Sequence, residues 1–219
     1  MKNKSVILLS GGLDSLVSLG AGIEEYNVRL ALTFDYGQKP ANQEIKASKK
    51  IAEYYGIEHK VITLPFLKEI TTTGLLTGDV PTENFGTMES AKAVWVPNRN
   101  GLFLNIACSI AEAKEFTHIL FGANKEEGQT FPDNTPEFVS GINESFKYST
   151  MYGIKVVAPL INYNKNDIVK LALELGVPLE LAYSCYNSED KNCGVCESCK
   201  HLKSALEHNK AFNYIERLF

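Results

Sequence analysis

Short apolar runs alternate along this chain with longer segments whose apolar residues recur at helical spacing. Apolar runs of strand length lie at residues 6–9, 28–34, 59–64, 117–121 and 154–158. Helical spacing marks residues 13–25, 42–55, 101–113, 137–148, 164–175 and 198–207. Strands that alternate with helices predict an α/β fold: an open, mostly parallel five-stranded sheet with helices on both faces.

If the strand order is 3-2-1-4-5, a topological switch lies between the first and fourth strands. Ligands of such sheets bind in the crevice outside the carboxyl ends of the strands. The segments that begin there are residues 10–15, residues 35–38 and the chain from Gly122 onward. These segments are also polar and aperiodic, so topology and polarity predict the same site.

Two stretches interrupt the pattern. Residues 65–93 are rich in Thr, Gly, Pro and Asn, without clear periodicity. They indicate an irregular insertion, a candidate flap over the site. Residues 125–136 are polar, and we interpret them as a loop.

The turn after the first strand, Ser10-Gly11-Gly12-Leu13-Asp14-Ser15, carries the strongest chemical signal in the chain. Adjacent glycines let the backbone approach a ligand closely, and the N-terminus of the following helix attracts anions. The turn has neither the Walker pattern nor the Gly-x-Gly-x-x-Gly of dinucleotide folds. It resembles the PP-loop of N-type ATP pyrophosphatases, which cleave ATP between its α and β phosphates and pass AMP to an acceptor. The alternative is a βα turn that binds no ligand.

Three further polar segments are candidates for ligand binding. Residues 35–38, Asp-Tyr-Gly-Gln, end the second strand and suit an adenosine base or ribose, or else form an ordinary capped turn. Arg99 stands between two asparagines at the start of a helix, and it suits a carboxylate or phosphate, or else a surface salt bridge. Asp133 follows a proline and suits Mg²⁺ or the orientation of an amine, or else belongs to a Pro-Asp turn.

Four of the five cysteines lie close together near the C-terminus, with the spacing C-x₇-C-x₂-C-x₂-C from Cys185 to Cys199. Four thiolates in so short a segment suit tetrahedral zinc. An iron–sulfur cluster is the rival, because C-x₂-C-x₂-C also occurs in ferredoxins. With four protein ligands, a zinc ion would be structural. Cys108 is alone in an apolar helix, and we expect it to be a core residue.

Composition narrows the function further. The chain has 219 residues, of which 44% are hydrophobic and 22% charged, so we expect residues 1–219 to form a single domain with 185–199 as its zinc-binding element. A net charge of −4 has the wrong sign for a protein that grips nucleic acid. No stretch approaches the about 20 apolar residues of a membrane span, and no signal-peptide pattern begins the sequence. We therefore expect a cytoplasmic protein with no nucleic-acid or membrane partner.

In combination, the motifs resemble the family of 7-cyano-7-deazaguanine synthases over nearly the whole chain. The matching segments are the PP-loop, Phe34-Asp-Tyr-Gly-Gln38, Val96-Pro-Asn-Arg-Asn100, Gly122-Ala-Asn124 with Pro132-Asp133, and the cysteine segment 192–199. The resemblance implies an ATP-dependent ligase of queuosine biosynthesis. This family converts 7-carboxy-7-deazaguanine and ammonia to the nitrile through adenylated acid and amide intermediates. The resemblance further implies Mg²⁺ with ATP, a structural zinc ion and a homodimer.

The resemblance implies that Ser10, Gly11, Gly12, Asp14 and Ser15 bind ATP and that the four clustered cysteines bind zinc. The complete sets of expected site residues are as follows. Residues expected to bind ATP are Leu9, Ser10, Gly11, Gly12, Leu13, Asp14, Ser15, Leu16, Asp35, Tyr36, Gln38 and Gly122. Residues expected to act in catalysis are Asp14, Arg99, Asp133 and Lys165. The expected zinc ligands are Cys185, Cys193, Cys196 and Cys199.

The chain departs from the family pattern at two places. The family shows Asp-x-x-Gly-Tyr-Pro-Asp-Cys-Arg where this chain has Glu127 and then Thr-Phe-Pro-Asp-Asn-Thr, so Asn134 and Thr135 replace Cys and Arg. Residues 200–203 also lack an arginine that the family has after its last cysteine. These changes leave open a related ligase that adenylates another carboxylate or stops at the amide.

Two more distant alternatives remain. A PP-loop tRNA thiolase would carry a basic RNA-binding extension and redox cysteines near the adenylate, and neither is evident in this sequence. A nucleic-acid-binding module with a vestigial PP-loop is disfavoured by the acidic charge balance.

Overall fold

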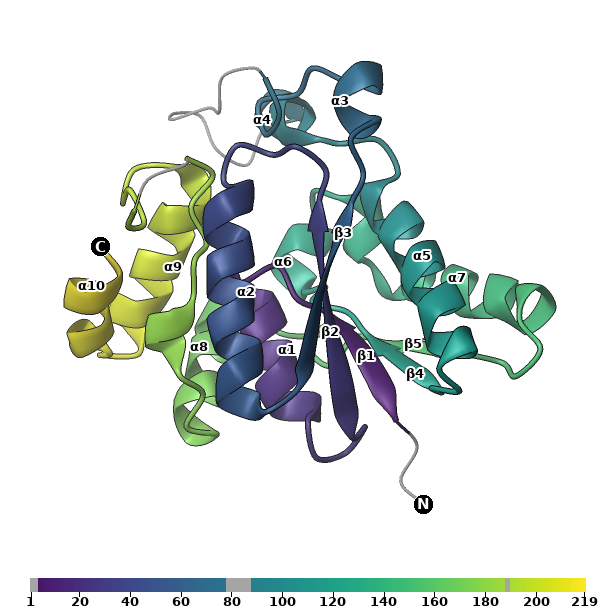
Figure 1. Ribbon diagram of the computed structural model, residues 1–219. Coiled ribbons are helices and arrows are strands. Elements are labelled where there is room, and N and C mark those ends of the chain that lie inside the picture. Colours follow the sequence, from purple (N-terminus) through teal and green to yellow (C-terminus); the bar gives the residue numbers. More distant parts are fainter. Residues whose placement is uncertain (1–3, 78–87, 188–189) are drawn as a thin grey trace.

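The computed structural model describes residues 4–77, 88–187 and 190–219, and a parallel sheet runs through the middle of them (Figure 1). Its strand order is β3-β2-β1-β4-β5, and each of the four strand pairings is parallel. The strands are β1 (Ser5–Leu8), β2 (Val28–Asp35), β3 (Glu58–Thr63), β4 (His118–Leu120) and β5 (Lys155–Val157). The sequence prediction of an open, parallel five-stranded sheet is confirmed, and the observed order is the one on which the expected switch point depends.

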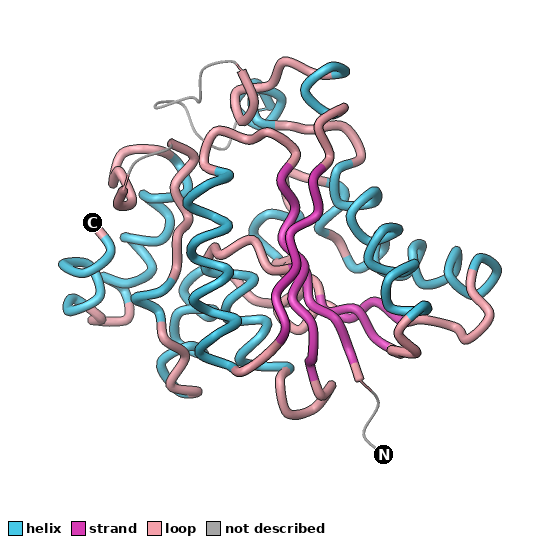
Figure 2. Tube along the Cα trace, viewed as in Figure 1, coloured by secondary structure: helices cyan, strands magenta, loops and turns pink. Residues whose placement is uncertain are grey.

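Helices cover both faces of the sheet, which Figure 2 shows as magenta strands between two groups of cyan helices. One group contains α1 (Leu13–Gly22), α2 (Ala41–Tyr55), α8 (Lys165–Glu174), α9 (Glu197–His208) and α10 (Phe212–Leu218). The other contains α5 (Arg99–Ala113) and α7 (Pro136–Ser149). Short helices lie in the connections: α3 (Leu67–Ile70), α4 (Met88–Val94), α6 (Lys125–Gly128) and the 3₁₀ turns η1 (Pro132–Asn134) and η2 (Leu179–Leu181).

Strand β1 is buried along its whole length because both of its faces meet helices. Val6 and Leu8 pack in the core that contains α5, whereas Ile7 and the following Leu9 pack in the core that contains α1. This alternation follows from the two-residue repeat of a strand. The central strand therefore fixes the position of the turn that follows it.

Two helix starts matter for the site. Asn164 caps α8, because its side chain accepts a hydrogen bond from the Asp167 amide and the Asp167 carboxylate accepts one from the Asn164 amide. This capping box fixes the position of Lys165, the first residue of α8. Helix α5 begins at Arg99, directly after Asn98 in a left-handed conformation with φ of 51°. Both basic residues are thus held at helix N-termini.

The structure differs from the sequence prediction at several places. The segment 125–136, predicted as a loop, contains α6 and η1, and the Asn124 side chain caps α6. The helix predicted over 13–25 ends at Gly22, and α10 was not predicted because seven residues are too few for a clear helical repeat. The insertion 65–93 contains α3 and α4, while residues 78–87 lie outside the described part of the chain. No helix within the described ranges has the length and apolar character that crossing a membrane requires.

Candidate active site

A cleft of about 240 Å³ lies at the carboxyl edge of the sheet. Its walls come from the turn after β1, the ends of β2 and β4, the segment that joins α4 to α5, the η1 turn and the start of α8. This is the crevice that the topological switch between β1 and β4 predicts.

The PP-loop turn forms the floor of the cleft, and its backbone takes a conformation that requires glycine. Gly11 has φ of +85°, and a Cβ atom there would lie 2.9 Å from both the Ala47 Cβ and the Glu44 carbonyl oxygen. Only glycine fits this position. Gly122 at the end of β4 also lies close to this turn, since a Cβ atom added there would be 3.1 Å from the Ser15 nitrogen. The two strands that flank the switch point therefore meet at the turn.

Serine hydroxyls accept hydrogen bonds from the backbone amides that would otherwise bind an anion. The Gly12 amide donates to Ser10 Oγ at 3.3 Å, and the Leu13 amide donates to Ser184 Oγ at 3.1 Å. Ser10 and Ser15 contact each other, with 3.1 Å between their Oγ atoms. Hydroxyls can rotate away and turn into donors, so these amides and hydroxyls together can receive a phosphate at the N-terminus of α1.

Lys165 joins the PP-loop to α6. Its Nζ donates to Asp14 Oδ2 at 2.6 Å and to Glu127 Oε1 at 3.0 Å, and only 12% of its side chain is exposed. Burial alone would lower the pKa of Lys165, but Asp14 and Glu127 outweigh burial and raise it. Lys165 in turn lowers the pKa of Glu127. Burial raises the pKa of Asp14, and the charge of Lys165 opposes that shift. Lys165 and Glu127 are therefore charged at neutral pH.

Arg99 faces the cleft from the start of α5. Its Nη1 donates to the Tyr36 hydroxyl at 3.3 Å, and its Nε donates to Asn100 Oδ1 at 3.3 Å. Burial would lower the pKa of Arg99, yet Tyr36, Asp133 and Glu127 raise it further above its ordinary value. The guanidinium is therefore a permanent, oriented cation beside the PP-loop, which suits a carboxylate or a phosphate.

Asp133 lies in the η1 turn near Arg99 and is 7% exposed. Asn134 Nδ2 donates to Asp133 Oδ1 at 3.0 Å. Burial raises the pKa of Asp133, and the charge of Arg99 and the Asn100 amide oppose the shift. Thr135 has a different task, because its Oγ1 accepts from the Phe138 amide at 3.1 Å and caps α7. Of the two residues that depart from the family pattern, Asn134 lines the cleft and Thr135 caps a helix.

Aromatic rings form the walls of the cleft. Trp95 and Phe131 stack with their centroids 5.9 Å apart and their planes at 7°, and Phe34 and Phe103 stack at 4.0 Å and 6°. The Tyr36 ring packs against Phe103 at 5.5 Å. Such walls suit a flat heteroaromatic ring.

The residues expected to bind ATP fall into two groups. Those that line the cleft are Leu9, Ser10, Gly12, Leu13, Asp14, Ser15, Tyr36 and Gly122. Gly11 shapes the turn from behind, and Leu16 is fully buried in the core. Gln38 is 4% exposed and Asp35 accepts a hydrogen bond from the Gly37 amide at 3.0 Å, so both brace the turn after β2. The four residues expected to act in catalysis, Asp14, Arg99, Asp133 and Lys165, all line the cleft.

Sequence reasoning missed several residues of the cleft. Trp95 and Phe131 could have been found, because they adjoin the Val96–Asn100 and Pro132–Asp133 motifs. Glu44 could not, since it lies inside an amphipathic helix where acidic residues usually face solvent. Ser184 gave no signal either, because its contact with Leu13 joins residues 171 positions apart.

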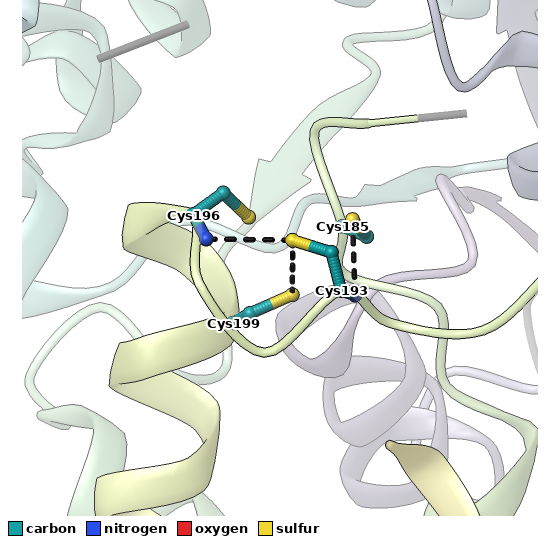
Figure 3. A group of neighbouring side chains, drawn as sticks. All are labelled: Cys185, Cys193, Cys196 and Cys199. Carbon is teal, nitrogen blue, oxygen red and sulfur yellow. Dashed lines mark hydrogen bonds between the residues drawn. The ribbon is translucent and has the colours of Figure 1, made fainter. Parts of the chain in front are cut away.

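The four clustered cysteines form a second site (Figure 3). One sulfur from each of Cys185, Cys193, Cys196 and Cys199 lies within 4.8 Å of the others. The Cys193 and Cys199 sulfurs are 3.9 Å apart. A tetrahedral ion with bonds of about 2.3 Å holds sulfurs about 3.8 Å apart, so the donor set fits a single metal ion. Amides of Asn187, Cys193 and Cys196 donate to these sulfurs, as they do to thiolate ligands.

The cysteine site also supports the PP-loop. Tyr183 and Ser184 directly precede Cys185. The Tyr183 amide donates to the Gly11 carbonyl at 2.8 Å, and Ser184 accepts from Leu13 as described above. Ser198, between two of the cysteines, lines the cleft. A metal ion held by the cysteines would therefore fix one wall of the active site.

Comparisons with known proteins agree with this picture. The family model described as "Queuosine biosynthesis protein QueC" matches residues 4–210. A 7-cyano-7-deazaguanine synthase from Carboxydothermus hydrogenoformans is 50% identical over 213 residues, covering 94% of this chain and 99% of that protein. Another of that name, from Methanosarcina barkeri, is 48% identical and covers 94% of both chains.

A likeness to a solved structure supports the fold alone. The structure is a 4-thiouridine synthetase in complex with RNA and with bound ATP. It has a TM-score of 0.53 and 19% identity, and the match covers 99% of this chain and 53% of that one. The two proteins therefore share a fold.

Proposed function

The chain belongs to the QueC family of queuosine biosynthesis proteins, and from this membership we propose that it makes 7-cyano-7-deazaguanine from 7-carboxy-7-deazaguanine, ammonia and ATP. The observation that supports the proposal is a single cleft in which the PP-loop, Lys165 and Arg99 converge between aromatic walls. Such a cleft can hold a triphosphate beside the carboxylate of a flat ring.

The reaction begins with activation of a poor electrophile. The substrate carboxylate attacks the α-phosphate, the bond between the α and β phosphates breaks, and pyrophosphate leaves. Amides of Gly12 and Leu13 bind the phosphates, and Lys165 stabilises the charge that develops on them. Arg99 orients the carboxylate for attack.

Ammonia then attacks the acyl carbon, AMP leaves, and the primary amide forms with release of a proton. The amide oxygen then attacks the α-phosphate of a second ATP and pyrophosphate leaves, after which loss of AMP and a proton gives the nitrile. The aromatic walls keep the ring in place, so the amide can stay bound for the second activation.

Two metal ions complete the proposal. Asp14 Oδ1 is buried with no hydrogen-bond partner in the described part of the chain, so Asp14, with Glu127 beside it, would hold the Mg²⁺ that neutralises phosphate charge. The four cysteines would hold zinc in a structural role. An iron–sulfur cluster fits less well, because its ligands bind different iron atoms and stand farther apart than these sulfurs.

We further propose that residues 1–219 act as one cytoplasmic domain, with 185–199 as its zinc-binding element, and that the protein is a homodimer. Three large apolar side chains support the dimer, because Tyr148, Met151 and Tyr152 are 83%, 87% and 71% exposed at the end of α7. Light scattering of wild type and Met151→Glu tests this surface, and a monomeric wild type would contradict it.

The decisive experiment is a reaction with ATP, Mg²⁺ and ammonium, with and without 7-carboxy-7-deazaguanine. Mass spectrometry should show the amide first and then the nitrile. Asn134 and Thr135, which depart from the family pattern, motivate the second candidate, a ligase that stops at the amide. Amide without nitrile would favour that candidate, and ATP binding without any product would indicate a different carboxylate.

A further inference from the structure

Glu44 is a carboxylate on the cleft wall that the proposed reaction leaves without a role. It lies near the start of α2, and its Oε2 accepts a hydrogen bond from Gln38 Nε2 at 2.7 Å. Gln38 is itself pinned to the end of β2, because its Nε2 donates to the Phe34 carbonyl and its Oε1 accepts from the Tyr36 amide, both at 3.0 Å. The carboxylate is therefore held in a fixed orientation at the cleft.

The surroundings of Glu44 are unusual for a carboxylate. Phe34, Tyr36 and Phe103 line the same cleft and stack or pack against one another. Burial raises the pKa of Glu44 to about 7. The charged and titratable groups that act on it are Asp35 and Tyr36 from the end of β2 and Arg99 from α5, and of these Arg99 favours the ionised form. An acid in such a place is costly to keep charged without a ligand.

Ring chemistry suggests which ligand would compensate this cost. An ionised carboxylate offers two adjacent acceptors and no donor. The amino-pyrimidinone edge of a 7-deazaguanine offers two adjacent donors, N1–H and the exocyclic amine. Adenine offers one donor beside an acceptor, which an ionised carboxylate repels. The carboxylate of the substrate stands on the opposite side of the ring system, where a cation such as Arg99 is required.

We propose that Glu44 binds the amino-pyrimidinone edge of the acid substrate through two hydrogen bonds, while Arg99 binds its carboxylate at the other end of the ring. The inference rests on the proposed function, because it needs a guanine-like substrate. Glu44 then selects guanine-like acids and sets the orientation in which the carboxylate meets the α-phosphate. Gln38 is its positioning residue.

Calorimetric binding of 7-carboxy-7-deazaguanine to the full-length, metal-loaded protein tests the proposal without ATP or ammonium. Glu44→Gln keeps an acceptor for Gln38 but replaces one substrate acceptor by a donor, so affinity should fall about 10- to 100-fold, the range for a hydrogen bond to a charged group. The analogue without the 2-amino group should bind wild type about 10-fold more weakly or worse. Glu44→Gln should bind the two compounds nearly equally.

Glu53→Gln is the matched control, because Glu53 lies on the same helix, is 65% exposed and pairs only with Lys49 at 3.9 Å among the described residues. It should bind both compounds as wild type does. Equal discrimination by wild type and Glu44→Gln would overturn the proposal. An unchanged affinity of Glu44→Gln for the acid together with weaker ATP binding would also overturn it, because Glu44 would then bind the ribose. An unchanged affinity for the acid together with a higher KM for ammonium would overturn it as well, because Glu44 would then act as a base.

Two further results keep the test separate from the proposed function. If wild type itself neither binds nor converts the acid, the proposed function fails, and with it the inference. If Glu44→Gln melts much earlier than wild type, Glu44→Asp replaces it, since the shorter acid keeps the charge but pulls the acceptors away from the ring. Glu44→Asp binding the acid as tightly as wild type would then overturn the proposal.

Discussion

Lys165 Nζ lies 2.6 Å from Asp14 Oδ2, and this contact joins the start of α8 to the PP-loop across 151 residues of sequence. Glu127 adds a second carboxylate at 3.0 Å. The two carboxylates fix the position of the lysine ammonium group for binding phosphate. They also neutralise its charge until the anionic phosphates bind. These two ion pairs explain why the lysine can remain charged beside the anion-binding turn in the ligand-free protein without a large desolvation penalty.

Lys165→Met should reduce turnover at least 100-fold and also destabilise the protein. The variant leaves Asp14 and Glu127 as neighbouring acids without their cation, and their side chains are 21% and 38% exposed. The free energy of unfolding should therefore fall, but by less than the about 3–5 kcal/mol of a fully buried pair. Urea denaturation and steady-state kinetics measure the two effects. Lys170→Met is the control on the same helix, because its pair with Glu174 is exposed and should be worth about 1 kcal/mol or less. Near-normal turnover in Lys165→Met would make Lys165 a structural residue only.

The sheet could be predicted from sequence because alternation and right-handed crossovers leave few arrangements. The cysteine cluster was visible because its four ligands lie close in sequence. The partners of Lys165 were not, since Asp14 and Glu127 are 151 and 38 residues away and no local pattern links them. The position of Glu44 on the cleft wall could not be predicted for another reason. It depends on the packing of α2 in the fold and on the hydrogen bond from Gln38. Periodicity thus predicts elements, whereas the meeting of side chains depends on packing.

The nucleotide products should be AMP and pyrophosphate. The PP-loop and Lys165 hold the phosphates while Arg99 brings the carboxylate to the α-phosphate, so the α–β bond is the one that breaks. Ion-exchange chromatography of the spent nucleotide gives the answer. Substrate-dependent ADP and phosphate without AMP would refute attack at the α-phosphate.

The cysteine site should contain one zinc ion per chain, and its loss should weaken both the fold and the phosphate site. Cys196→Ser removes a ligand, so metal content should fall and the melting temperature should drop, since structural zinc contributes ~10 kcal/mol or more in zinc-finger peptides. ATP binding should also weaken, because Ser184 next to Cys185 holds the Leu13 amide. Cys108→Ser, in the core of α5 and away from the cluster, should keep its zinc.

Metal analysis of protein purified without oxygen, together with its visible spectrum, measures the outcome. If the protein contains iron and absorbs broadly in the visible range, the site holds an iron–sulfur cluster and not a zinc ion. A stable, metal-free Cys196→Ser protein that lacks only activity would instead indicate a catalytic metal.

Arg99→Lys should lower kcat/KM for the acid substrate about 10- to 100-fold although the charge is kept. Lysine cannot bind a carboxylate through two parallel hydrogen bonds, nor can it keep the contacts with Tyr36 and Asn100. Arg217→Lys in α10, whose guanidinium contacts only the Tyr214 ring at 6.0 Å among the described residues, is the control and should be nearly neutral. Equal kcat/KM in wild type and Arg99→Lys would exclude bidentate recognition.

Glu44 should make the ligand-free protein less stable as the pH rises. Burial raises its pKa in the folded protein to about 7 from an ordinary value of 4.5. Between these values the folded state binds more protons than the unfolded state, so this stabilisation is complete below about pH 4.5 and is lost as the pH passes through about 7. Glu44→Gln removes the titration. The unfolding free energy of Glu44→Gln relative to wild type should therefore increase from pH 5 to pH 8 in urea denaturation. A constant difference for Glu44→Gln would contradict the raised pKa, and with it the account of Glu44 as a half-buried acid that its ligand keeps ionised.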